Sequence, residues 1–204
     1  MLNVQIRRSH PDDLDKILEV QTAALRALSF TYDSTQVESL VRSQATARTA
    51  EDEIRVIAEY EGELIGYAAI MALKPQISGI YVDPRFVRQG VGSQLLEAIE
   101  HIGIERGYAI VNVISSLATV DFYKARGYQN PLTTGFYSEQ KHWIRCVSLQ
   151  KQLINIPKVK RWRQHSHRWL SGLKAIMVWL LFQVAVIAIA SLVLFLIFAI
   201  LVLF

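Results

Sequence analysis

Two glycines and two arginines stand together in the stretch VDPRFVRQGVGSQLL, residues 82–96. Gly90 and Gly92 lie between a hydrophobic strand-like run and an amphipathic helix-like run, where the first backbone N–H groups of the helix have no partner within it. Such N–H groups bind anions, including phosphate. Glycine lets a ligand approach the backbone closely, and Arg85 and Arg88 add positive charge. The stretch therefore predicts an anion site, although a plain strand-to-helix turn would use the same glycine spacing.

The glycine pattern disfavours two common nucleotide sites. No Gly-Lys-Ser/Thr follows the glycines, as it would in a P-loop, and Gly90-Val91-Gly92 lacks the third glycine of a dinucleotide-binding fingerprint. The owner of the phosphate therefore has to be inferred from the elements around the loop.

The elements before the loop follow from hydrophobic periodicity. Residues 4–9 alternate like a strand, and two amphipathic helices are predicted over residues 10–28 and 34–45. Thr35 and Glu38 have the spacing of a capping box for the second helix. Residues 54–73 read as two strands joined at Glu61-Gly62, which is a hairpin signal. A further strand over residues 76–82 contains Gly79 as a bulge or a site of close approach.

The elements after the loop complete a mixed α/β domain. A helix ends at Gly107, a buried strand covers residues 108–114, a short helix ends at Gly127, and a last strand covers residues 141–149. Strands and helices in this order predict one sheet with helices on both faces.

Charge is distributed unevenly along the 204-residue chain. Residues 1–150 hold all 18 Asp and Glu and 15 of the 22 Lys and Arg, whereas residues 151–204 hold 7 Lys and Arg and no acidic residue. The basic balance of the chain therefore belongs to its C-terminal part. We expect no nucleic-acid partner, because a binding face on the domain would need its own basic patch.

Cysteine and histidine usage predicts no metal site. Cys146 is the only cysteine, which excludes an internal disulfide and a multi-cysteine metal site, and it is interpreted as a small buried thiol. His165 and His167 have no third ligand nearby and are expected to be solvated. The N-terminus lacks the apolar run of a signal peptide, so we expect the domain in the reducing cytoplasm.

Residues 175–204 contain no charged residue, which is typical of a membrane span. A helix of this length measures about 45 Å against a hydrocarbon layer of about 30 Å, so tilting is expected. The basic residues just before it, interleaved with Trp162 and Trp169, are typical of the cytoplasmic side of a span. We therefore expect a single-pass, tail-anchored protein with a cytoplasmic domain and the lipid bilayer as a partner.

Two segments resemble the GNAT superfamily of acyl-CoA N-acyltransferases. GIYVDPRFVRQGVGSQLLEAI, residues 79–99, is similar to the fourth strand, pyrophosphate loop and following helix of that family. SSLATVDFYKARGY, residues 115–128, is similar to the end of its fifth strand and the short helix with an aromatic-tyrosine pair. The resemblance covers residues 4–153 and implies a mixed, mostly antiparallel sheet. The predicted parts are an N-acetyltransferase domain (1–153), a basic juxtamembrane segment (154–174) and a transmembrane helix (175–204).

The resemblance implies that acetyl-CoA lies in a cleft where the fourth and fifth strands separate. The backbone of Ile80, Tyr81 and Val82 would pair with the pantetheine arm like an added strand. The pyrophosphate would be held by backbone N–H groups of the loop and first helical turn, namely Arg88, Gln89, Gly90, Val91, Gly92 and Ser93.

Tyr123 matches the family tyrosine that donates a proton to the departing CoA thiolate. Phe122 is expected to be core, and the structural alternative is that both aromatic rings only anchor the helix. The expected activity is transfer of an acetyl group from acetyl-CoA to a primary amine by direct attack. A catalytically idle acyl-CoA sensor and a membrane-anchored interaction scaffold are the alternatives.

Three positions depart from the family pattern. Val87 stands where Arg or Gln is usual in the loop, and Ala118 stands where many members carry an Asn that contacts CoA. Ser78 stands where many members have a Glu that orders a water or acts as base. The general base is therefore unassigned, and an ordered water relay is one possibility. The residues considered for this role are Glu59, Asp83, Tyr137 and His142.

Overall fold

Seven strands form one mixed sheet, in the order β1-β2-β3-β4-β5-β7-β6, in the computed structural model of the chain. The structure describes residues 2–47 and 52–154. Neighbouring strands pair antiparallel except β4 and β5, which are parallel. The strands are β1 (Gln5–Arg8), β2 (Glu53–Tyr60), β3 (Glu63–Met71), β4 (Gln76–Val82), β5 (Ile110–Ser116), β6 (Gln129–Tyr137) and β7 (Trp143–Gln152).

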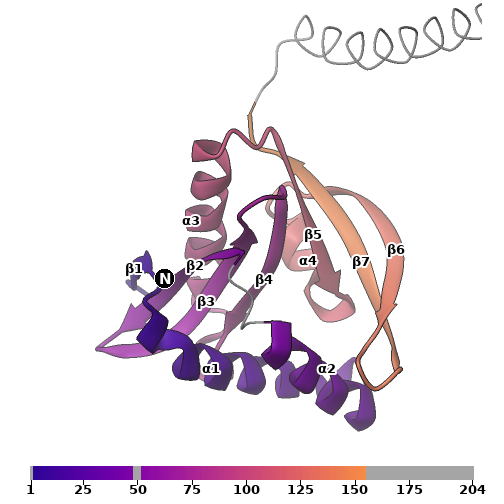
Figure 1. Cartoon of the computed structure of the whole chain (residues 1–204). Helices are drawn as coiled ribbons and strands as arrows, with labels where there is room; N and C mark the ends of the chain where they lie inside the picture. The colour runs from indigo at the N-terminus through magenta and orange to yellow at the C-terminus, as the bar shows by residue number, and fades with distance from the viewer. Residues whose placement is uncertain (1, 48–51, 155–204) are drawn as a thin grey trace, which may run out of the picture. The chain divides into compact units, whose positions relative to one another are not determined.

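Helices cover both faces of this sheet (Figure 1). Ala68 of β3 packs in the same buried cluster as Leu95, whereas its neighbour Tyr67 packs in the cluster of Ile17. This alternation is expected for strands covered on both faces, because successive side chains point to opposite sides. The predicted mixed, mostly antiparallel sheet with helices on both faces is therefore confirmed. One face carries α3 (Val91–Glu105) and α4 (Val120–Lys124), and the other carries α1 (Leu14–Arg26) and α2 (Ser34–Ala47).

Short 3-10 turns flank several of these elements. They are η1 (Pro11–Asp13), η2 (Ala27–Phe30), η3 (Pro84–Phe86) and η4 (Leu117–Thr119). The hairpin predicted at Glu61-Gly62 joins β2 to β3, and both turn residues have positive φ, 51° and 82°. Positive φ at both central residues is the geometry that two-residue hairpin turns require.

The cap of α2 differs from the prediction. The Gln36 N–H donates to Asp33 Oδ1 at 2.8 Å, and the Asp33 N–H donates to Gln36 Oε1 at 3.2 Å. The prediction of Thr35 and Glu38 as the capping box is therefore wrong. Glu38 instead accepts a 3.0 Å hydrogen bond from the Arg26 side chain, which links α2 to the end of α1.

Residues 131–140, for which the sequence patterns predict no helix or strand, are mostly strand. β6 covers Gln129–Tyr137 and pairs with β7 along its length, with an irregularity between Gln129 and Leu132. Pro131 lies inside that irregularity, at an edge strand, which is where a sheet tolerates a residue without an N–H donor.

The predicted juxtamembrane segment and transmembrane helix lie outside the described residues, apart from Ile154. Within residues 2–47 and 52–154, no helix is both long enough and apolar enough to cross a membrane.

Candidate active site

β4 and β5 pair over only two positions and then separate. Gln76 pairs with Asn112 and Ile77 with Val113, after which β4 continues to Val82 and β5 to Ser116 without pairing with each other (Figure 1). The structure therefore has the strand divergence that the resemblance implied.

Backbone groups of β4 face the gap that this divergence leaves. The Asp83 N–H donates to the Ile65 carbonyl of β3 at 2.8 Å. Because hydrogen-bonded pairs alternate along an antiparallel ladder, the backbone groups of Tyr81 also face β3, and those of Ile80 and Val82 face the gap. Of the three residues predicted to pair with a pantetheine arm, Ile80 and Val82 thus present backbone amide groups to the gap, whereas Tyr81 does not.

A β-bulge lies where the two strands separate. Ala69 pairs with Gly79 and Ile70 pairs with Ile77, so Ser78 is an extra residue in β4. The sequence predicted a bulge at Gly79, and the observed bulge lies one residue earlier, at Ser78. Among the described residues, the Ser78 hydroxyl oxygen is one of two buried side-chain polar atoms without a hydrogen-bond partner.

The glycine loop leads from β4 through η3 into α3. Gly90 precedes α3 with φ 92° and ψ −5°, and Arg88 also has positive φ, 64°. The N–H groups of Val91 and Gly92 lie in the first turn, where no carbonyl is available one turn earlier. The Ser93 N–H, in contrast, already donates to the Gly90 carbonyl at 3.0 Å. The loop thus has the geometry of an anion cradle at a helix N-terminus.

The positive charge near the loop differs from the prediction. The Arg85 guanidinium is held by Asp83 and Glu63 in ion pairs, so the prediction that it adds net positive charge is wrong. Val87 is half-exposed and supplies no charge. Arg126, which follows α4, donates instead to the hydroxyl of Ser93 in the first turn of α3.

Tyr123 lies on α4, 4% exposed, within the core cluster on the α3 face. Burial raises the pKa of its phenol above the ordinary value, and the nearby Tyr81 raises it further. The phenol therefore stays protonated at neutral pH, as a proton donor must. Phe122 was expected to be core but is only partly buried; its ring lies against Gly92, at ordinary van der Waals distance from where a Cβ would stand.

Tyr81 lines the opposite face of the sheet. Its ring stacks on Tyr67 with a centroid distance of 5.2 Å and an interplanar angle of 20°. The ring folds back over Gly79, where a Cβ would collide with it, which makes Gly79 a site of close approach as predicted. Tyr67 in turn donates to Gln21 Oε1 of α1 at 2.7 Å. Tyr81 and Tyr123 thus pack on opposite faces of the sheet.

Comparison with known proteins identifies the family. The profile described as "Acetyltransferase (GNAT) domain" matches residues 25–153, more than half of the chain. The chain belongs to the GNAT acetyltransferase family. A curated relative from Archaeoglobus fulgidus, named "Uncharacterized N-acetyltransferase", is 24% identical over 148 residues, which are 67% of this chain and 100% of the relative.

Solved GNAT structures share the fold. A GCN5-related N-acetyltransferase from Rhodopseudomonas palustris superposes with a TM-score of 0.69 and 23% identity, covering 74% of this chain and 97% of that one. PaiA N-acetyltransferase from Thermoplasma acidophilum, solved with coenzyme A, gives 0.59 and 16%, covering 74% and 99%. YncA from Salmonella typhimurium, a putative acetyltransferase solved with acetyl-CoA, gives 0.55 and 18%, covering 76% and 97%. The predictions of an acyltransferase and of acetyl-CoA as co-substrate are confirmed.

The residues considered as general base in this GNAT domain lie in structural contacts. Glu59 accepts from Arg7 at 2.8 Å, on the β1 edge of the sheet. Asp83 caps η3, and its hydrogen bonds with Arg85 lower the pKa of its carboxyl. Tyr137 packs against Trp143 at the β6–β7 hairpin, and the His142 N–H donates to Ser138 in the same hairpin. None of these contacts places one of the four residues next to Ser78, the position where many family members carry a Glu.

Two features of the GNAT site were missed in the sequence. Arg126 lies four residues after Phe122, a spacing that places both on one side of a helical turn and would have indicated a shared role. Beside Ala118, three hydroxyl groups lie close together: Thr119 Oγ1 is 3.0 Å from Ser115 Oγ and 2.9 Å from Ser116 Oγ.

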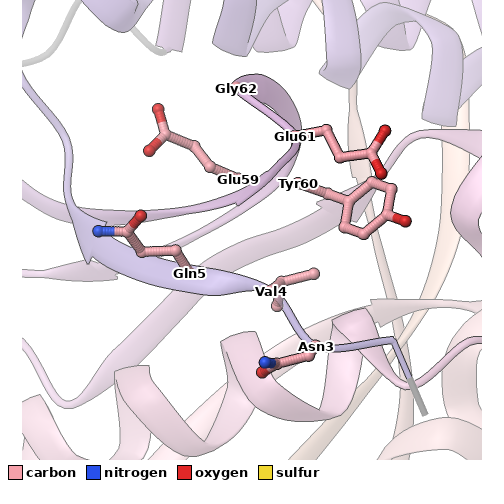
Figure 2. Close-up of a pocket in the computed structure, with 7 residues that line it drawn as sticks. All are labelled: Asn3, Val4, Gln5, Glu59, Tyr60, Glu61 and Gly62. Atoms are coloured by element: carbon pink, nitrogen blue, oxygen red, sulfur yellow. The ribbon is translucent and has the colours of Figure 1, made fainter.

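A separate cavity of about 450 Å³ lies at the β1 side of the GNAT domain (Figure 2). Figure 2 shows the side chains of Glu59 and Glu61 pointing in different directions at its rim. Carboxylates repel phosphate, so this cavity does not fit CoA. The residues that line the cavity are Asn3, Val4, Gln5, Glu59, Tyr60, Glu61 and Gly62.

Across residues 2–47 and 52–154, no group of three or more His, Cys, Asp or Glu is arranged to hold a metal ion.

Proposed function

We propose that this GNAT domain transfers an acetyl group from acetyl-CoA to a primary amine by direct attack. The observation that carries the proposal is the separation of β4 and β5 after Ile77 and Val113, directly before the glycine loop. The gap offers the amide groups of Ile80 and Val82 to an amide-containing arm, and the start of α3 offers N–H groups to its phosphates.

Acetyl-CoA, when bound, supplies the thioester whose acetyl group is transferred. The amine nitrogen forms a bond to the acetyl carbon, the carbon–sulfur bond breaks, and the Tyr123 hydroxyl gives its proton to the sulfur. The amine loses one proton to solvent, and Tyr123 regains one from solvent. The burial that raises the pKa of Tyr123 keeps the donor protonated until the sulfur becomes basic.

Two residues, Gly90 in the loop and Ser78 in β4, fit the binding of acetyl-CoA. A Cβ at Gly90 would be strained, because φ is 92° there. The Ser78 hydroxyl is buried without a partner at the end of the β4–β5 pairing, where a bound ligand or water would satisfy it. Both features suit a site shaped for a backbone-bound ligand.

An amine panel tests the activity. The full-length chain in detergent is expected to release free CoA thiol from acetyl-CoA in the presence of an accepted amine, with acetylated amine detected by mass spectrometry. Binding of acetyl-CoA without turnover of any amine would indicate the idle acyl-CoA sensor instead. No binding would leave only the interaction scaffold.

We further propose that the domain is held at the cytoplasmic face of a membrane, so that its acceptor is an amine found near that surface. The apolar run of residues 175–204 and the basic residues before it support this tether. Deletion of residues 175–204 is expected to move the protein from the membrane fraction to the supernatant. Retention in the membrane fraction would contradict a transmembrane tether.

A further inference from the structure

We propose that Arg126 binds the pyrophosphate of acetyl-CoA and supplies the side-chain charge that Val87 does not. This inference rests on the proposed function, because it concerns the same binding site. It adds a residue from a different part of the chain to the backbone cradle of the glycine loop.

The guanidinium of Arg126 is fixed at the start of α3. Its Cζ lies 4.1 Å from the centroid of the Phe122 ring, and Nη1 donates to the Phe122 carbonyl at 3.2 Å. Nη2 donates to the hydroxyl of Ser93. The stacking on Phe122 and the two hydrogen bonds hold the side chain at the first turn of the helix, next to Ser93.

The charge of Arg126 is not neutralised by a carboxylate. Within the part of the chain that the structure describes, its hydrogen bonds go to a carbonyl and a hydroxyl, and no ion pair to it is formed. The acidic residue of α4, Asp121, lies 3.9 Å from Lys124 instead. Arg85, which also lies close to the loop, is paired with Asp83 and Glu63. An uncompensated guanidinium at a positive helix terminus favours an anion between them.

The hydrogen-bonding capacity of arginine fits this role. A guanidinium has five N–H donors in a planar fork that matches phosphate oxygens, and the protein contacts leave donors for a ligand. The neighbouring ring contributes to the arrangement, because Phe122 packs beside Gly92 in the first turn of α3, 3.5 Å from where a Cβ of residue 92 would stand. The unbound structure therefore already holds the arginine near the position that a pyrophosphate would take.

The test compares donors with and without the pyrophosphate, using the full-length chain in detergent. Arg126→Gln is expected to weaken binding of acetyl-CoA and of 3′-dephospho-CoA by the same factor, about 10- to 100-fold, as loss of a charged hydrogen-bonding partner predicts. Binding of S-acetylpantetheine, which lacks the pyrophosphate, should be unchanged. Arg126→Lys should retain part of the affinity. The matched control is Lys124→Gln, which removes a half-exposed cation at the end of α4, two residues before Arg126.

Four results decide the inference. Equal weakening for S-acetylpantetheine would mean that Arg126 only holds α4 in place, and would overturn it. Weakening for acetyl-CoA but not for 3′-dephospho-CoA would assign the arginine to the 3′-phosphate and overturn it. Equal affinity of wild type and Arg126→Gln for acetyl-CoA would also overturn it. Failure of the wild-type protein to bind any CoA would instead refute the proposed function, which keeps the two failures distinct.

Discussion

The hydroxyl of Tyr32 donates a 2.7 Å hydrogen bond to the backbone carbonyl of Arg145 in β7. The same oxygen accepts from the Leu117 N–H, at the end of β5, at 3.1 Å. Tyr32 is buried and lies between α1 and α2. One phenol thus links the α1–α2 connection to the end of β5, which borders the active-site gap, and to β7, the next strand in the sheet.

Replacing Tyr32 with Phe is therefore expected to destabilise the domain. The change removes the hydroxyl and leaves the Leu117 N–H and the Arg145 carbonyl without this partner, which costs about 1 to 3 kcal/mol of unfolding free energy. Urea denaturation of both proteins measures the difference. Tyr137→Phe, at an exposed tyrosine, is the control and should change little; equal stability of all three proteins would contradict the role of Tyr32.

Gly90 and Gly92 are expected to respond differently to alanine. Gly90→Ala places a Cβ at φ 92° and should cost about 1 to 2 kcal/mol. Gly92→Ala puts a Cβ 3.5 Å from the Phe122 ring, an ordinary contact, and should preserve stability because alanine favours the helix. Thermal unfolding of the two variants without ligand distinguishes them. Similar losses in both would show that the backbone conformation of Gly90 is not the limiting factor.

Tyr123→Phe tests the proposed proton donor. Loss of a general acid lowers turnover by about 100-fold or more, so kcat should fall while the Kd for acetyl-CoA stays the same. Tyr108→Phe is the matched control, since its hydroxyl donates to Ala72 at 2.9 Å, away from the gap. An unchanged kcat in Tyr123→Phe would remove the phenol from the mechanism.

The Asp13 ion pair predicts a loss of stability in acid. Hydrogen bonding to Arg7 lowers the pKa of the Asp13 carboxyl to about 2, so the folded state keeps it charged while the unfolded chain takes up a proton. Its contribution is present above about pH 4 and is lost as the pH falls towards 2. Asp13→Asn should lower the unfolding free energy at pH 7, and its difference from wild type should shrink as the pH falls from 4 through about 2. Asp12→Asn, at an exposed neighbour, should show no such convergence.

Ser78→Ala is expected to stabilise the ligand-free domain. It removes a buried hydroxyl that has no partner among the described residues, which recovers up to about 1 kcal/mol of unfolding free energy. Ser115→Ala provides the contrast, because the buried Ser115 hydroxyl donates to the Ser116 carbonyl at 2.8 Å. Loss of this hydrogen bond should lower the unfolding free energy. Destabilisation in both variants would indicate that Ser78 has a partner in solution.

Local patterns in the sequence were sufficient for most of the fold. Glu61-Gly62 predicted its hairpin because the turn needs two residues of positive φ. Gly107, with φ 75°, follows the end of α3 as predicted. The β6 strand was missed because Pro131 and Gly135 are turn-forming residues, and only pairing with β7 overrides that preference.

The parts of the site that are formed by the backbone of one continuous segment could be predicted from the sequence. The parts that depend on contacts between distant segments could not. Gly90 follows from the local motif. The contact between Arg126 and Ser93 joins residues 33 positions apart, and the pairing of Arg85 with Glu63 joins residues 22 positions apart. Neither contact can be read from residue spacing within one element.

The bulge at Ser78 determines which residues of β4 reach each side of the active site. If Ser78 paired regularly with Ala69, every later residue of the strand would change face. Tyr81 would then point towards α3, and Ile80 and Val82 would point towards α1. The one extra residue at Ser78 therefore sets the face of the sheet to which each later side chain of β4 points. It directs Tyr81 to the face covered by α1, and Ile80 and Val82 to the face covered by α3.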